Sequence, residues 1–308
     1  MFTEMICANR ADWLEQRRQG IGASDAAVIL GLTKWKSPMG LYAEKTGLVP
    51  MSQEESDILE WGQRLEPVIA LKYADETGRE VIDPGPYTIQ KSRNVDFQLA
   101  TLDRIVTGGQ PEAALSKDGP GALELKNVIE FKREDWQDEP PLLYQVQVQH
   151  QLAVTGFTWG SIAAIIGGRS FVWQDIPRNE RFISILLHRE EEFWRRVVDQ
   201  RPPAPDDSEA TAEVIKALYP REQDGQVIAA PPELMSYADQ LAAAKLEIKA
   251  LELKEREAEN HIKAFIGEHL GCVLPNGVTY TLKAQKRASY VVQATEFRVL
   301  RRVGDKKR

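Results

Sequence analysis

The sequence predicts an α/β (α+β) fold in which a central mixed β-sheet is flanked by helices. Three observations lead to this class. Helical patterns dominate residues 10–77, short alternating apolar runs follow in residues 79–128, and residues 141–200 read as helix, two strands and helix. Helices that precede a mixed sheet and then pack on it are typical of this class.

The N-terminal helices are marked by their end residues. They are residues 10–18, a short helix from Ser24 to Gly31, a helix from Ser37 to Gly47, and a long helix to about Thr77 opened by the capping-box spacing of Ser52 and Glu55. Ser24 or Asp25 is expected to cap the second helix, because short oxygen side chains accept free backbone N–H groups. Pro67 predicts a kink or break just after Glu66.

Strand-like segments follow, separated by Pro, Gly and Asn. They are residues 79–83, 86–90, 96–102, 104–107, 122–128, 158–167 and 170–176. Residues 108–121 form a turn-rich connector, and helices are expected at 141–155 and 179–200. The strands and the two later helices would form one layered core.

Three prolines at 202, 203 and 205 mark a linker, so we place a domain boundary near residue 205. Residues 1–205 form the first predicted domain and residues 206–308 the second. In the second, residues 232–270 have the composition of one long helix, as in a coiled-coil arm. Residues 272–283 follow, and Asn276-Gly277 between two β-rich runs predicts a hairpin.

Composition excludes several classes of protein. The chain of 308 residues has ordinary globular composition, only two cysteines and four scattered histidines, which argues against a disulfide framework or a cysteine-based metal site. No apolar run is long enough to span a membrane, so the chain is expected to be cytoplasmic. The net charge is −7, yet the tail 281–308 holds nine basic against two acidic residues. This tail is either a solvated end or a contact for phosphate or an acidic partner.

Residues 122–127 carry the chemistry that the sequence predicts. On a strand, Leu123 and Leu125 point into a core while Glu124 and Lys126 share the opposite face. A carboxylate that binds a divalent metal, beside an ammonium that orients water, suits phosphodiester hydrolysis. Asp103 is a second candidate ligand. By itself an acid–x–lysine strand pattern is usually an exposed salt bridge, so its context decides.

That context resembles the PD-(D/E)xK nuclease superfamily and, more narrowly, the lambda-type phage exonucleases and YqaJ-like viral recombinases. Four segments carry the resemblance, in order: Gly20-Ile-Gly-Ala-Ser-Asp25, Trp61-Gly-Gln-Arg-Leu-Glu-Pro67, Ala100-Thr-Leu-Asp-Arg104 with Leu123-Glu-Leu-Lys126, and the glutamine-rich stretch Tyr144–Gly156. The match covers roughly residues 10–200. It implies a restriction-endonuclease-like core.

The resemblance assigns roles residue by residue. It implies a catalytic set of Glu66, Asp103, Glu124, Lys126 and Gln147, with metal bound by Glu66, Asp103, Glu124 and the Leu125 carbonyl. Two Mg²⁺ ions are expected, with Mn²⁺ as an alternative ion. Gln151 lies one helical turn beyond Gln147 and could share its face. Arg104 departs from the family, which has a glycine after the aspartate.

The same resemblance assigns Arg17 and Ser24 to a terminal 5′-phosphate of DNA. A serine at a helix start places its hydroxyl near free N–H groups, which bind phosphate readily. Without the rest of the pattern, Ser24 would be only a cap and Arg17 a surface residue. For the tryptophans at 35, 61, 136 and 159, core packing is the default expectation.

The leading hypothesis is a Mg²⁺-dependent 5′-to-3′ exonuclease that acts on double-stranded DNA ends and leaves 3′ single strands for recombination by annealing. By resemblance, the chain would form a homo-oligomeric ring, expected as a trimer, and work with a single-strand annealing protein. Two alternatives stay open: an endonuclease or repair nuclease with the same core, and a non-catalytic DNA-binding assembly protein on the same fold.

Overall fold

The computed structural model describes residues 2–51, 57–107, 119–222, 226–289 and 298–301. It divides into two units, Met1–Pro220 and Arg221–Arg308, which are considered separately. The helices of the first unit are α1 (Arg10–Arg18), α2 (Ala23–Ile29), α3 (Pro38–Lys45), α4 (Asp57–Thr77), the 3₁₀ helix η2 (Glu130–Trp136), α5 (Leu142–Thr155), α6 (Glu180–Val198) and α7 (Glu209–Leu218).

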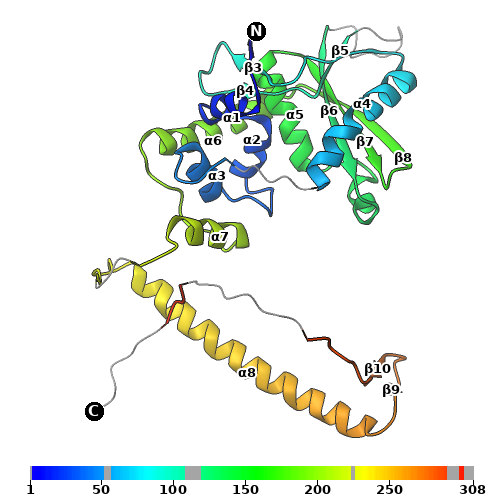
Figure 1. Cartoon of the computed structure of the whole chain (residues 1–308), viewed down its shortest axis with the longest axis vertical. Coiled ribbons are helices and arrows are strands. Elements are labelled where there is room, and N and C mark those ends of the chain that lie inside the picture. Colours follow the sequence, from blue (N-terminus) through cyan, green and yellow to red (C-terminus); the bar gives the residue numbers. More distant parts are fainter. Residues whose placement is uncertain (1, 52–56, 108–118, 223–225, 290–297, 302–308) are drawn as a thin grey trace. The chain divides into compact units, whose positions relative to one another are not determined.

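Two sheets form the β-structure of the first unit (Figure 1). The strands are β1 (Phe2–Ile6), β2 (Glu80–Ile82), β3 (Thr88–Ser92), β4 (Leu99–Ala100), β5 (Arg104–Thr107), β6 (Gly121–Val128), β7 (Trp159–Ile166) and β8 (Ser170–Pro177). The larger sheet has the order β2-β5-β6-β7-β8, with β6 and β7 parallel and the other neighbours antiparallel. The smaller, antiparallel sheet has the order β1-β3-β4. The predicted mixed sheet flanked by helices is confirmed.

Helices cover both faces of the larger sheet, because its strands alternate two apolar faces. Leu123 and Leu125 of β6 pack with Ile69 and Tyr73 of α4 on one face. On the other face, Ala122 and its neighbours pack against apolar side chains of α5. Since β6 is buried between α4 and α5, any polar side chain on it must find a partner in the protein or a ligand.

The segment that joins α1 and α2 is clamped to the strand region before β5. The Ile21 N–H donates to the Phe97 carbonyl (2.6 Å), and the Leu99 N–H donates to the Ile21 carbonyl (2.9 Å). Gly20 is required here, since a Cβ at this position would lie 2.4 Å from the Phe97 carbonyl oxygen. The clamp brings the N-terminal signature beside the strands that carry the acidic residues.

Several local predictions were wrong. Gly22, not Ser24 or Asp25, is the N-cap of α2, and the Asp25 side chain accepts the Gly22 N–H (3.0 Å). A kink or a break was predicted just after Glu66. The break does not occur, because α4 continues through Pro67 and its buried face, with Ile69 and Tyr73, packs on the sheet on the far side of the proline. The predicted capping pair Ser52 and Glu55 lies outside the described residues.

Core packing was predicted for four tryptophans and is confirmed for two of them. Trp136 and Trp159 are buried, whereas Trp35 and Trp61 are 70% and 57% exposed.

The structure also divides the chain after the proline segment rather than within it. The reason is α7, which the sequence did not predict and which packs against α3 before the division at Pro220.

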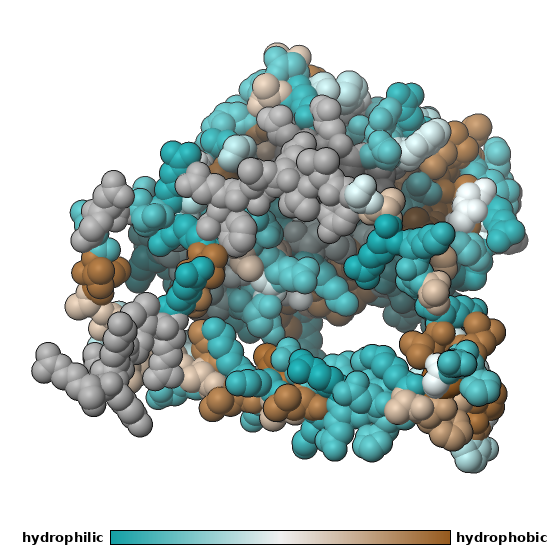
Figure 2. All heavy atoms as spheres, turned by 60° about the horizontal axis from the view of Figure 1, so that its bottom comes forward, coloured by the Kyte–Doolittle hydropathy of each residue, from teal (hydrophilic) through white to brown (hydrophobic). Residues whose placement is uncertain are grey.

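The second unit contains α8 (Leu234–Ile266) and an antiparallel hairpin of β9 (Gly271–Val273) and β10 (Thr279–Thr281). The hairpin turn has Gly277 at φ +84°, as the Asn-Gly pair predicted. Apolar side chains interrupt the hydrophilic surface of α8, including Leu246 and Leu251, which are 71% and 62% exposed (Figure 2). Among the described residues, no helix has the length and apolar character needed to cross a membrane.

Candidate functional site

Glu124 and Lys126 of β6 lie side by side, as the strand alternation predicted. The Lys126 ammonium donates a hydrogen bond to Glu124 Oε1 and lies 5.1 Å from the centre of the Tyr144 ring. Burial alone would lower the pKa of Lys126, but Glu124 and Asp103 outweigh it and raise that pKa above its ordinary value. Lys126 is therefore a fixed positive charge and not a proton acceptor near neutral pH.

Asp103 lies directly before β5 and meets β6 through strand pairing. Arg104 is opposite Leu123, and the Leu125 N–H donates to Asp103 Oδ2 (2.8 Å). The sequence had placed Asp103 at the end of a strand 96–102. Only β4 forms there, and it belongs to the other sheet, so β5 is the strand that brings Asp103 to Glu124.

Burial and the nearby Glu124 raise the pKa of Asp103 well above its ordinary value, against the opposing effect of Lys126. Glu66 of α4 belongs to the same electrostatic group. Burial raises the pKa of Glu66 too, while Arg104 and Lys126 oppose that rise. The three carboxyl groups, from α4, from the residue before β5 and from β6, line the same cavity and form what we call the acidic end of the site.

The four glutamines of α5 divide between two faces of the helix. Gln145 and Gln149 donate to the carbonyls of Pro140 (2.7 Å) and Pro177 (2.8 Å). Gln151 donates to Glu124 Oε2 (2.6 Å). The spacing of four residues explains the division, since each pair shares one face.

Gln147 and Gln151 both line the cavity described below. Their Oε1 atoms are buried and have no hydrogen-bond partner within the described part of the chain. Gln147, which the resemblance singled out, thus reaches the site, but Gln151 makes the contact with a carboxylate. Buried oxygens without partners are unfavourable unless a ligand supplies a donor or a cation.

The oxygen atoms around the acidic end decide whether the site fits the predicted divalent metal. No three His, Cys, Asp or Glu side chains among the described residues converge as a ready ligand set. The donors at the acidic end nevertheless fit a hard divalent ion, because carboxylate, carbonyl and amide oxygens are its preferred ligands. Burial and the Glu124 charge disfavour ionisation of Asp103 and raise its pKa, and a bound cation would oppose that effect. Metal binding by these residues stays a prediction.

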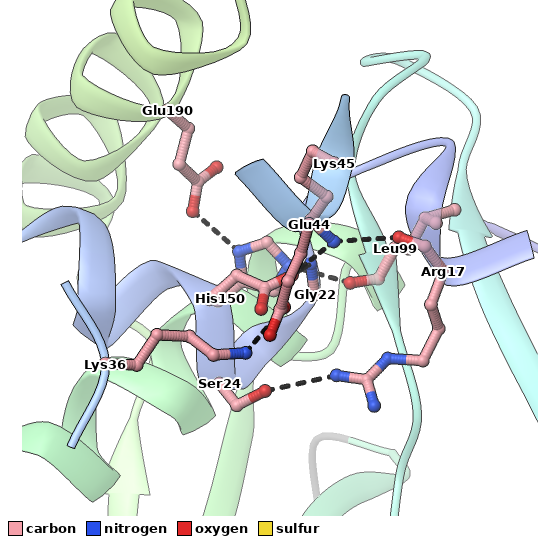
Figure 3. A network of polar contacts seen from close by, with 10 residues as sticks. Arg17, Gly22, Ser24, Lys36, Glu44, Lys45, Leu99, His150 and Glu190 are labelled. Atoms are coloured by element: carbon pink, nitrogen blue, oxygen red, sulfur yellow. Dashed lines mark hydrogen bonds and ion pairs between the residues drawn. The ribbon is translucent and has the colours of Figure 1, made fainter. Parts of the chain in front are cut away.

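Arg17 and Ser24 contact each other, although they lie on different helices. The Arg17 guanidinium donates to Ser24 Oγ (3.2 Å), as Figure 3 shows, and its carbon lies 4.6 Å from the centre of the Trp13 ring. In the same network, the buried Lys45 ammonium binds Asp25 Oδ2 (2.7 Å) and donates to the Arg17 carbonyl (2.8 Å). Arg17, Ser24 and Trp13 form what we call the basic end of the site.

One cavity of about 640 Å³ joins the two ends. Its lining includes every side chain that the sequence assigned to catalysis or to the 5′-phosphate: Arg17, Ser24, Glu66, Asp103, Glu124, Lys126 and Gln147. Seven positions spread over 131 residues of sequence therefore share one concave surface. Such convergence of charged groups in a cavity is the usual mark of a functional site.

A fully buried contact between His150 and Glu190 adjoins Leu99, a residue of the cavity lining (Figure 3). The His150 ring on α5 contacts Glu190 Oε1 of α6 (2.7 Å) through Nδ1 and the Leu99 carbonyl (2.8 Å) through Nε2. Burial alone would lower the pKa of His150, but Glu190 outweighs it and raises that pKa. His150 therefore connects α5 to Leu99 of β4. The Leu99 N–H in turn donates to the Ile21 carbonyl, which links β4 to the segment before α2.

Sequence reasoning missed several residues of the cavity wall. Trp13, Asp83 and Tyr87 line it, and Tyr144 covers Lys126. Arg104, noted only as a departure from the family, also lines the cavity and pairs with Asp83 (3.4 Å). A basic residue directly after the candidate ligand Asp103 was a usable signal. The aromatic residues gave none, because their position depends on tertiary packing.

Comparison with known proteins identifies the family. Residues 12–158 match the YqaJ-like viral recombinase domain. The chain is 34% identical over 279 residues to the uncharacterized protein YqaJ of Bacillus subtilis (strain 168), covering 87% of this chain and 84% of that protein. The chain belongs to the YqaJ-like viral recombinase family. The resemblance drawn from the four sequence segments is thereby confirmed.

Solved structures show the same fold. The alkaline exonuclease LHK-Exo in complex with dAMP superimposes with a TM-score of 0.50 at 19% identity, covering 67% of this chain and 96% of that one. A second structure of this exonuclease, from Laribacter hongkongensis, gives 0.49 at 21% identity, covering 62% and 94%. At this identity, the likeness to the dAMP complex shows that the two chains share an α/β fold.

Proposed function

We propose that this YqaJ-like protein is a Mg²⁺-dependent 5′-to-3′ exonuclease that acts on double-stranded DNA ends and leaves 3′ single strands for annealing. The observation that carries the proposal is the single cavity that joins Glu66, Asp103, Glu124 and Lys126 to Arg17 and Ser24. An enzyme that removes 5′-terminal nucleotides one at a time has to hold the DNA end within one nucleotide of the bond that it cuts. A shared cavity suits both tasks.

The residues of the acidic end divide the chemistry between them. Asp103, Glu124 and the Leu125 carbonyl would hold a divalent ion, with Glu66 at a second position. When bound, such ions polarise the phosphodiester and lower the pKa of coordinated water. Lys126, kept charged by Glu124 and Asp103, would orient the attacking water and offset negative charge on the phosphoryl oxygens. Gln151 holds the Glu124 carboxylate in position.

The basic end would set the 5′-to-3′ direction of degradation. A guanidinium that is held by Ser24 and backed by the Trp13 ring is restrained before DNA binds, so it can form charge-assisted hydrogen bonds to a phosphate with little loss of entropy. The family resemblance assigns this phosphate to a 5′ terminus. The homo-oligomeric ring and the annealing partner follow from the family resemblance and belong to this proposal.

The decisive experiment uses linear duplex DNA with phosphorylated or unphosphorylated 5′ ends, in Mg²⁺ or in EDTA. Wild type is compared with Glu124→Ala and Lys126→Ala, and Lys132→Ala serves as the control because Lys132 is exposed on η2. We expect metal-dependent nucleotide release that prefers 5′-phosphorylated ends and falls at least roughly 10²–10³-fold in the two site variants only.

The other outcomes identify the alternatives. Nicking of closed circular DNA in a parallel reaction would replace the exonuclease with an endonuclease. DNA retention in a shift assay without cleavage under any condition would indicate a DNA-binding assembly protein and would refute the proposal.

A further inference from the structure

The turn that precedes β3 holds an aromatic residue in an unfavourable backbone conformation. Tyr87 has φ +61°, in the left-handed region that residues other than glycine rarely adopt. Hydrogen bonds fix the turn on both sides. The Cys7 N–H donates to the Tyr87 carbonyl (3.1 Å), and the Thr88 hydroxyl donates to the Pro84 carbonyl (2.9 Å). A strained conformation that its surroundings enforce often marks a functional position.

The conformation does not serve to bury the Tyr87 ring. Tyr87 is 37% exposed and lines the same cavity as the two ends of the site. Its ring contacts that of Trp13, with centres 6.2 Å apart and planes at 54°. Trp13 in turn packs against the buried cluster of Cys7, Ile89 and Leu99. Trp13 is thus the fixed support, and Tyr87 is the ring that remains accessible.

The two rings continue the line of the phosphate contact. Arg17 covers the Trp13 ring and reaches Ser24, so Tyr87, Trp13, Arg17 and Ser24 follow one another along one wall. An accessible aromatic ring next to a cation and a hydroxyl matches the parts of one nucleotide, whose base and 5′-phosphate are joined by a single sugar. Aromatic rings stack on every base, without reading its identity.

We propose that Tyr87, supported by Trp13, is the stacking platform for the base of the 5′-terminal nucleotide whose phosphate Arg17 and Ser24 bind. The inference rests on the proposed 5′-end function and adds that Tyr87 recognises the base of the terminal nucleotide. Stacking without sequence readout suits an exonuclease, which must accept each base in turn.

The test measures DNA binding by the full chain in EDTA, which prevents cleavage. The probes are 3′-labelled duplexes with a short 5′ overhang, so that the terminal base is already unpaired. The terminal nucleotide carries either a base or an abasic analogue, and either a 5′-phosphate or a 5′-hydroxyl. Fluorescence anisotropy gives the four affinities for wild type and for each variant.

Three variants separate the ring from the backbone. Tyr87→Gly removes the ring and suits the positive φ, so the turn is preserved. Tyr87→Phe keeps the ring, and Trp35→Ala removes an exposed aromatic residue that does not line the cavity. Thermal unfolding of each variant confirms that the fold is intact.

Wild type, Tyr87→Phe and Trp35→Ala should bind the probe with a terminal base about tenfold more tightly than the abasic probe. Tyr87→Gly should bind both with the same, weaker affinity. A base preference that is absent in wild type, or that persists in Tyr87→Gly, would overturn the platform. The phosphate arm is independent: base preference without phosphate preference would refute 5′-phosphate recognition and leave the platform standing.

Discussion

The two ends of the cavity solve the problem of buried charge in opposite ways. Next to the basic end, the Asp25 carboxylate is paired with the buried Lys45 ammonium and accepts the Gly22 N–H. Burial alone would raise the pKa of Asp25, but Lys45 and Arg17 outweigh it and lower that pKa. At the acidic end, burial and Glu124 raise the pKa of Asp103. The protein itself stabilises the ionised form of Asp25, whereas the ionised form of Asp103 is unfavourable in the protein without a bound cation or substrate.

This difference indicates which charges support the fold and which support function. A carboxylate with a buried cation as partner contributes to stability as soon as the chain folds. A carboxylate next to two others is unfavourable in the free protein and becomes favourable only with a cation or with substrate. Substitutions at the two ends should therefore have opposite effects on stability, which the following predictions test in order of expected size.

The largest effect is expected for Asp25→Asn. It leaves the Lys45 ammonium buried without a charged partner, which typically costs about 3–5 kcal/mol. Because the folded-state pKa of Asp25 is lowered, its contribution is present above the ordinary carboxyl pKa and is lost as pH falls through the lowered value. Denaturant unfolding at several pH values measures both effects.

The control for this substitution is the pair Asp25→Asn with Lys45→Met. Removing both charges should restore much of the stability that the single change loses. If the double variant is as unstable as the single one, the ion pair is not the source of the effect and the contrast with Asp103 fails.

The second effect is expected for Arg17→Ala and concerns substrate binding. Loss of a charge-assisted hydrogen bond to phosphate should reduce the preference for 5′-phosphorylated ends by roughly 10–100-fold. The loss should appear in KM, with kcat at saturating DNA unchanged, because Arg17 lies at the basic end and not among the acidic residues. Arg189→Ala, an exposed arginine on α6, is the matched control. An equal loss in kcat would show that the two ends are not separable.

Much of the acidic end could be predicted from the sequence, because its geometry is local. Alternation along one strand places Glu124 beside Lys126 whatever the rest of the fold does. Arg17 and Ser24 were predicted only through the family pattern, since nothing within either helix indicates that the two side chains meet. The fold class followed from the order of helical and strand-like segments.

The rest depends on contacts that sequence spacing does not reveal. Tyr87 reaches the cavity through a turn bonded to Cys7, eighty positions earlier in the chain. His150 reads as one more polar residue on a glutamine-rich helix, yet its partner Glu190 lies on another helix. The capping error at Ser24 has the same origin. The tertiary clamp at Gly20 and Ile21 starts the helix earlier than the local signal suggested.

The smallest effect, and the sharpest test of the comparison, is expected for Asp103→Asn. The amide still accepts the Leu125 N–H, while the unfavourable charge next to Glu124 is removed. In EDTA, the free energy of unfolding should rise by about 1 kcal/mol, a shift of roughly 2–4 °C in Tm, even though nuclease activity is lost. Asp75→Asn, on the exposed side of α4, should leave Tm unchanged.

The pH dependence gives the Asp103 prediction its sign. Because the folded-state pKa of Asp103 is raised, the folded protein binds this proton more tightly than the unfolded chain does. Wild-type stability from this group is therefore full below the ordinary carboxyl pKa and declines as pH rises through the raised value. The advantage of the asparagine variant should grow over that same interval. If Asp103→Asn instead lowers stability at neutral pH, as Asp25→Asn should, then both aspartates stabilise the fold. The carboxylate of Asp103 is then not unfavourable in the protein without a cation.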